Sequence, residues 1–315
     1  MLAALLCALA VQAQTLTVTS PTDGAFVGSS TQVKFLISGA TLEVTVKALA
    51  TGPGGVQTSV EGRFTPNSQG QIDNNLTLSF GPSNPEGAYT IVVTATEPGA
   101  TYTPKTLNVT LDRTKPKFLQ FNPTNNAFVR GPFIPISVEL DEANVKEWRV
   151  QVNNQDIPNN TGNTQSFTVT WDTSGIELDG AQTITIKVTD EAENTATQSI
   201  SVTLDRVDPV LTIQYPRSDT NLRRRATISV VVDVTDLSTS SIDVTGIDVF
   251  VQSLTGAFIT RVARSSVRTS GNNTLRWSGR IRWRPGLPNE FKIVTTARDR
   301  AGNVAATQEV TVRLR

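Results

Sequence analysis

The chain has 315 residues, 28 basic and 28 acidic side chains, no histidine and a single cysteine, Cys7. Its length fits two or three domains, since single domains cluster near roughly 100 to 150 residues. Without histidine and with one thiol, the chain lacks the side chains for Ser-His-Asp or Cys-His catalysis and for imidazole metal sites, and it cannot close an internal disulfide.

An apolar segment opens the chain and is predicted to be a signal peptide covering residues 1–13. It ends with Val11 and Ala13 in the positions that a signal peptidase recognises, which predicts export to the cell surface, the periplasm or the medium. The run is too short to span a bilayer and no Lys or Arg precedes it, so we expect the native start to lie upstream of Met1 and the mature chain to have no membrane span. Cys7 is interpreted as filler of the apolar run, because Leu6 is not the small residue that a lipoprotein anchor requires.

The next feature is an internal repeat, which marks the domain organisation. Residues 109–116 (VTLDRTKP) and 202–209 (VTLDRVDP) share six residues at identical spacing, 93 positions apart. We interpret both as domain junctions, in which Pro116 and Pro209 stiffen linkers of a few residues and favour a semi-rigid rod on the order of 90 Å long. The predicted order is a signal peptide, 1–13, followed by three domains, 14–112, 113–205 and 206–315.

Two further anchors repeat within each predicted domain. Near the start, an alternating strand runs into a Pro-led turn, at Pro21, Pro123 and, in a weaker match, Pro216. Near the end comes a turn that opens with an acidic residue and closes with Asn. It is written DEAEN at 190–194 and DRAGN at 299–303, and residues 97–100 (EPGA) are a degraded copy.

Between the anchors, apolar and polar residues alternate with a period of two, which predicts strands buried on one face. Ile184 and Ile186 face one way, for example, while Thr183 and Thr185 face the other. Turn signals every 8 to 12 residues, roughly, favour a seven-stranded sandwich in each unit. An aromatic residue near the end of the preceding strand is expected to anchor each core: Phe80, Trp171 and Trp283.

The acidic turn and its flanking strands, at 179–194 and 294–303, resemble the closing hairpin of bacterial Ig-like domains. The resemblance covers the second and third units well and the first poorly, because residues 97–99 depart from the acidic-x-Ala-Gly-Asn pattern. It implies an all-β chain of three tandem immunoglobulin-like β-sandwiches in a rod-like array. The family is common in tandem repeats of exported adhesins and as spacers beside catalytic or binding modules, although this fold hosts unrelated functions.

Charge is distributed unevenly along the chain, although the total is zero. Residues 14–112 carry four basic and seven acidic side chains, 113–205 seven and twelve, and 206–315 seventeen and nine. The third unit is also longer than the second by 16 residues between equivalent anchors, and the addition falls around 233–267. Added material on a rigid sandwich either carries binding function or forms an extra edge strand.

The basic side chains of the third unit are almost all arginines. In the predicted strand around 274–284, Leu275, Trp277, Ile281 and Trp283 share one face and four arginines the other. This pattern predicts a positive surface for an anionic polymer such as acidic polysaccharide, lipopolysaccharide or DNA. A solvated outer face, or a surface that docks on an acidic neighbouring unit, also explains the pattern and is the preferred interpretation, because a run of charges is usually a solvated face. The candidate ligand-binding residues are Arg223, Arg224, Arg225, Arg276, Arg280, Arg282 and Arg284.

The expected function is that of a non-enzymatic exported structural, adhesion or spacer protein, with no catalytic residue, metal ligand or cofactor. Two alternatives stay open: a module that binds an anionic polymer through the third unit, and an accessory module of a secreted carbohydrate-active system. The expected partner is an envelope or extracellular polymer or another surface protein, ahead of nucleic acid. Calcium at the junctions also stays open, because acidic residues gather there without forming a D-x-D-x-D-G loop.

Overall fold

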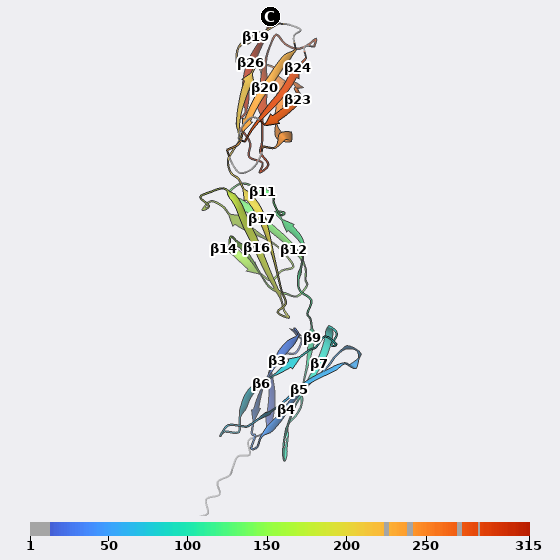
Figure 1. Ribbon diagram of the computed structural model, residues 1–315. Coiled ribbons are helices and arrows are strands. Elements are labelled where there is room, and N and C mark those ends of the chain that lie inside the picture. Colours follow the sequence, from blue (N-terminus) through green and yellow to red (C-terminus); the bar gives the residue numbers. More distant parts are fainter. Residues whose placement is uncertain (1–12, 224–226, 238–241, 270–272, 283) are drawn as a thin grey trace, which may run out of the picture.

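Three β-sandwiches, called domains 1, 2 and 3, follow one another in this computed structural model, which describes residues 13–223, 227–237, 242–269, 273–282 and 284–315. Figure 1 shows them in line along an elongated molecule, with the C-terminus at one end. No helix in the described parts is long and apolar enough to cross a bilayer. Apart from Ala13, the predicted signal peptide lies outside the described residues, and the predicted domain boundaries stay a prediction.

Domain 1 packs a three-stranded sheet, in the order β1-β3-β6, against a sheet in the order β2-β9-β7-β4-β5, with β8 paired to β7. The pair β2 and β9 is parallel, and β3 is antiparallel to both of its neighbours. Its elements are β1 (Thr15–Ser20), β2 (Ala25–Val27), β3 (Ser30–Ser38), β4 (Val44–Thr51), η1 (Pro53–Gly55), β5 (Gln57–Phe64), β6 (Ile72–Ser79), β7 (Gly87–Glu97), β8 (Ala100–Thr101) and β9 (Lys105–Leu111).

Domain 2 repeats this arrangement with the sheets β10-β12-β15 and β11-β17-β16-β13-β14. Two facing sheets joined in this order form an immunoglobulin-like sandwich. Its strands are β10 (Lys117–Asn122), β11 (Phe128–Val129), β12 (Phe133–Asp141), β13 (Val145–Val152), β14 (Gln155–Gly162), β15 (Ser166–Asp172), β16 (Gly180–Asp190) and β17 (Thr195–Leu204).

Domain 3 has the sheets β18-β20-β24-β23 and β19-β26-β25-β21-β22. Its first sheet therefore has four strands where domains 1 and 2 have three, and the added one, β23, lies at the sheet edge beside β24. Its elements are β18 (Val210–Tyr215), β19 (Thr220–Leu222), β20 (Ile228–Thr235), η2 (Val244–Gly246), β21 (Asp248–Gln252), β22 (Phe258–Arg261), β23 (Ala263–Thr269), β24 (Thr274–Ile281), β25 (Glu290–Thr296) and β26 (Gln308–Leu314).

Each domain has its own apolar core, formed by the inward residues of its two sheets. This follows from the period-two alternation, which turns every second side chain of a strand toward the facing sheet. Phe80 and Trp171 are buried as expected, whereas the buried indole of domain 3 belongs to Trp277, and Trp283 lies outside the described residues. The prediction of an all-β chain of three tandem immunoglobulin-like sandwiches is confirmed.

Candidate functional site

The arginine of the repeated Leu-Asp-Arg sequence fastens the second linker to the domain before it. The Nε atom of Arg206 lies 2.7 Å from Oδ1 of Asp179, and the two carboxylate oxygens of Asp179 accept from both the side chain and the amide of Arg206. Arg206 also donates from Nη1 to the carbonyl oxygen of Thr173 and from Nη2 to that of Ile176, both at 2.8 Å. The linker is thus hydrogen-bonded to loops at one end of domain 2.

The first linker is fastened in the same way but less tightly. Arg113 donates from Nη1 and Nη2 to the carbonyl oxygens of Gly81 and Asn84, at 3.2 and 2.5 Å. Its amide donates to Glu86 at 2.9 Å, but the charged Nε atom stays 3.9 Å from that carboxylate. Because the ion pair is longer and more exposed than that of Arg206, we expect it to stabilise this junction less.

The acidic turn of the following domain holds each linker from the other side. In domain 3, Asn303 Nδ2 donates to the carbonyl oxygen of Asp205 at 3.0 Å and to Oδ2 of Asp299 at 2.8 Å, while its amide donates to Oδ1 of Asp299. In domain 2, Asn194 makes the matching bonds to the carbonyl oxygen of Asp112, at 3.1 Å, and to the carboxylate of Asp190. The closing Asn of the repeated turn is therefore a clamp between consecutive domains.

Domain 1 closes the corresponding turn with its own residues. The carboxylate of Glu97 accepts hydrogen bonds from the amides of Thr41 and Leu42, at 2.7 and 2.6 Å, and from the hydroxyl of Tyr102, at 2.7 Å. Burial raises the pKa of Glu97, but hydrogen bonds from Thr41, Tyr102 and Leu42 outweigh it and lower that pKa to about 2. Glu97 stays ionised at neutral pH and acts as the acceptor for the turn.

Three buried carboxylates converge at the second junction. One oxygen each of Asp205, Asp236 and Asp299 lies within 4.8 Å of the others. Hard cations such as Ca²⁺ prefer carboxylate ligands, so these residues could hold a divalent ion. The clamp already uses part of the cluster, because Asp299 accepts from Asn303 and Asp205 accepts from the amide of Val207. Asp205 belongs to the acidic residues that gather at the predicted junctions, whereas Asp236 follows β20 and reaches the linker only through the packing of the folded domain.

The predicted arginines of domain 3 differ in their surroundings within the described residues. Arg276 donates two parallel hydrogen bonds, both 2.7 Å long, to the carboxylate of Asp233 on the neighbouring strand β20. This ion pair neutralises the charge of Arg276. Arg223 is exposed just after β19 and lines no part of the depression described next. Arg224 and Arg225 lie outside the described residues. Which of the predicted arginines bind a ligand stays a prediction.

The remaining three predicted arginines meet two that sequence analysis missed, around a depression of about 580 Å³. We call it the arginine depression; its five arginines are Arg261, Arg264, Arg280, Arg282 and Arg284. They come from the end of β22, from β23, and from the end of β24 with the turn that follows. The available signal was the 16-residue length difference of the third unit, which falls in the region of these two strands.

The chain resembles known proteins in structure but not in sequence. No family model and no curated protein sequence matches the chain. Among solved structures it is similar to the fibronectin(III)-like modules of Clostridium thermocellum CbhA, with 12% identity over 64% of this chain and 94% of that one and a TM-score of 0.43. It is also similar to a tetra-tandem repeat in the extending region of a large adhesion protein, with 19% identity over 96% of this chain and 74% of that one and a TM-score of 0.28. Extracellular domains 3–5 of Drosophila OTK are also similar, with 13% identity over 95% of this chain and 97% of that one and a TM-score of 0.30.

Proposed function

We propose that this protein is a non-enzymatic, exported spacer or adhesion protein that uses three immunoglobulin-like domains as a semi-rigid extension. The observation that carries the proposal is the clamp at each junction. Arg113 and Arg206 fasten the linkers to the preceding domains, and Asn194 and Asn303 fasten them to the following ones.

Clamps of this kind restrict the relative orientation of neighbouring domains. A linker of a few residues that is hydrogen-bonded to both of its neighbours leaves few torsions free to bend. Because the second clamp is buried, water does not compete freely for its hydrogen bonds. An extension that keeps its end-to-end distance suits a protein that presents a distant surface.

The absence of catalytic function in this proposal rests on chemistry. The chain has no histidine, and the buried carboxylates Glu97, Asp190 and Asp299 serve as acceptors for turn and junction amides. The hydrogen bonds that hold the pKa of Glu97 at about 2 make this carboxylate a poor general acid or base near neutral pH. Export is supported by the sequence of residues 1–13, and we expect the secreted form to begin at Gln14 when its N-terminus is sequenced.

A distance measurement between domains 2 and 3 tests the clamp. Because no cysteine follows Cys7, spin labels placed by Gln198→Cys and Gln308→Cys in the mature chain report one pair of sites. Double electron–electron resonance is expected to give a narrow distance distribution, which Asn303→Ala broadens. Asn221→Ala, an exposed asparagine on β19, is the matched control and should leave the width unchanged. A broad distribution in the unsubstituted chain would overturn the proposal.

A further inference from the structure

The arginine depression gathers more positive charge than the nearby carboxylates balance. Its described lining residues include five arginines, which stay protonated at any physiological pH, and no acidic residue. Arg261 pairs with Asp248 at 2.7 Å, and Arg284 donates only a long hydrogen bond, 3.4 Å, to the carbonyl oxygen of Ile259. Within the described residues, Arg264, Arg280 and Arg282 have no acidic partner. The depression therefore carries a net positive potential.

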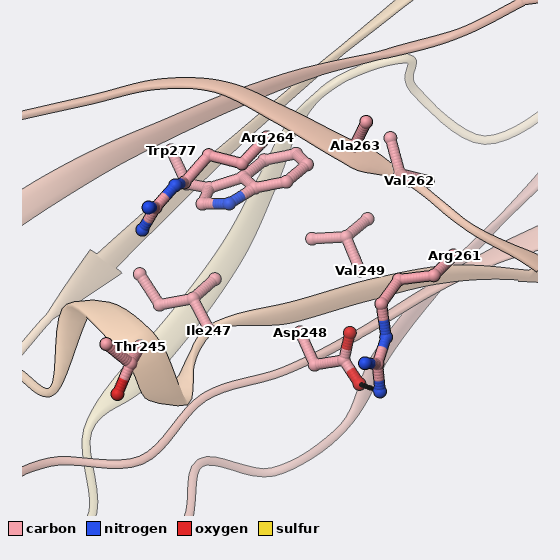
Figure 2. Close-up of a pocket in the computed structure, with 9 residues that line it drawn as sticks. All are labelled: Thr245, Ile247, Asp248, Val249, Arg261, Val262, Ala263, Arg264 and Trp277. Atoms are coloured by element: carbon pink, nitrogen blue, oxygen red, sulfur yellow. Dashed lines mark hydrogen bonds and ion pairs between the residues drawn. The ribbon is translucent and has the colours of Figure 1, made fainter.

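The segment that joins the two sheets forms one wall of this depression. Residues 261–264 cross from β22 to β23, and they also border a second depression of about 590 Å³ on their other side. Figure 2 shows this second depression, in which Asp248 holds Arg261 and in which Trp277 and Arg264 both take part. Arg264 and Arg280 stand on the paired strands β23 and β24, and this pairing places their backbone before any ligand arrives. Arg282 and Arg284 lie in the turn that follows β24.

Stability of domain 3 does not explain this arrangement. Arg264, Arg280 and Arg282 gather around one depression without an acidic partner among the described residues, and like charges held close together repel one another. Long side chains do shield a sheet edge with their stems, but that role needs length and not guanidinium groups. Repulsion among the arginines is relieved when an anion binds, which makes a ligand the better explanation.

We propose that the arginine depression binds an acidic polysaccharide, with the guanidinium groups of Arg264, Arg280 and Arg282 receiving its carboxylate or sulfate groups. A guanidinium group offers two parallel N–H donors that match the two oxygens of such a group. Thr260 and Ser265 also line the depression, and their hydroxyls suit the hydroxyl groups of a sugar. Binding of such a ligand would add a second function to the spacer role, and this proposal does not depend on that role.

The shape of the arginine depression favours a polysaccharide over duplex DNA. Duplex DNA is read by a helix or β-ribbon that enters a groove, and a concave depression offers no such projection. A half-open hollow that combines cations with hydroxyl groups suits a polymer of acidic sugars.

The test is calorimetric titration of the full mature chain with polygalacturonate, heparin fragments, a 20-nucleotide single-stranded DNA and neutral dextran. The depression variant is Arg264→Gln/Arg280→Gln/Arg282→Gln. The control is Arg217→Gln/Arg300→Gln/Arg315→Gln, which removes the same charge from exposed positions outside the depression. Circular dichroism and the unfolding temperature of both variants establish that they fold.

Binding to polygalacturonate or heparin is expected to weaken at least tenfold in the depression variant and less than threefold in the control. It should weaken further between 50 and 300 mM salt, by about tenfold or more for several ionic contacts. Polygalacturonate alone would identify carboxylate as the group bound, and heparin alone would identify sulfate. Equal losses in the two variants, no binding by either polysaccharide, or tighter binding of the DNA would overturn the proposal. A depression variant that fails to fold is replaced by the single change Arg280→Gln, expected to weaken binding at least threefold.

Discussion

Domains 2 and 3 share one repeated plan but treat their surface arginines differently. In domain 2 the exposed Arg149 is paired with Asp156, whereas in domain 3 Arg264 and Arg280 have no acidic partner among the described residues. The difference coincides with β23, the strand that domain 3 adds at its sheet edge. Both domains keep the linker arginine and the closing Asn of the turn. The two domains therefore share the hydrogen bonds at their junctions and differ in the strands at their sheet edges.

The largest expected effect comes from Gly279→Ala, which removes the space that β23 uses. A Cβ atom there would lie 2.2 Å from Cη2 of Trp277 and 2.8 Å from the carbonyl oxygen of Ala263 on β23. Either the indole or the added strand must move, so domain 3 is expected to lose about 3 kcal/mol of unfolding free energy. Hydrogen exchange of the full chain would show it as faster exchange in β23 and β24. Gly175→Ala in domain 2 has no atom within 4 Å and should change nothing; unaltered exchange in β23 of the first variant would contradict the assignment.

A second test compares the two junctions. Arg206→Ala removes a close ion pair and two carbonyl contacts, and it leaves Asp179 without its cation, so domain 2 is expected to lose about 2 kcal/mol. Arg113→Ala should cost about half as much in domain 1, because its ion pair with Glu86 is long and more exposed. Hydrogen exchange in the loops before β7 and β16 measures both. Equal losses would show that the ion pair adds nothing to the carbonyl contacts.

A smaller effect is expected from Asp233→Asn, which makes Arg276 resemble the unpaired arginines of the arginine depression. The variant leaves Arg276 facing Arg268 without its carboxylate, so the unfolding temperature of domain 3 should fall slightly at low salt and recover at high salt. Calorimetry at the two salt concentrations provides the measurement. A fall that does not depend on salt would mean that packing, and not charge, is affected.

The last test concerns the pH dependence of domain 1, where Glu97 takes the place of the interdomain clamp. The pKa of Glu97 is lowered from 4.5 to about 2 in the folded domain, so its ionised form contributes stability above pH 4.5 that is lost as the pH falls toward 2. The unfolding temperature of domain 1 should therefore decline over this window, and Glu97→Gln should flatten that part of the decline. An unchanged pH profile in the variant would argue against this role.

Sequence patterns predicted the sandwiches because their causes are local. Alternation turns Ile184 and Ile186 inward whatever the rest of the chain does, and the repeated turns follow from short-range hydrogen bonds such as those of Asp190 and Asn194. The repeated Leu-Asp-Arg sequence also has a structural use, because Arg113 and Arg206 donate hydrogen bonds to carbonyl oxygens of the preceding domains.

The candidate site was predicted only in part, because it depends on pairing between distant segments. Arg276 and Asp233 are 43 residues apart, and only the register of β20 and β24 brings them together. Arg261 and Arg264 could not be assigned before β23 was known to be an extra edge strand. Trp277 lies in the core of domain 3, and the prediction for Trp283 falls outside the described residues.

The most direct test of the account is the relative orientation of domains 2 and 3 in solution. Residual dipolar couplings of the full mature chain in a weakly aligned medium report an alignment tensor for each domain. If the Asn303 clamp and the Arg206 anchor fix the second junction, the two tensors must agree in magnitude and in principal axes. Tensors that differ in both respects would show that the domains reorient independently, and the semi-rigid extension would be contradicted.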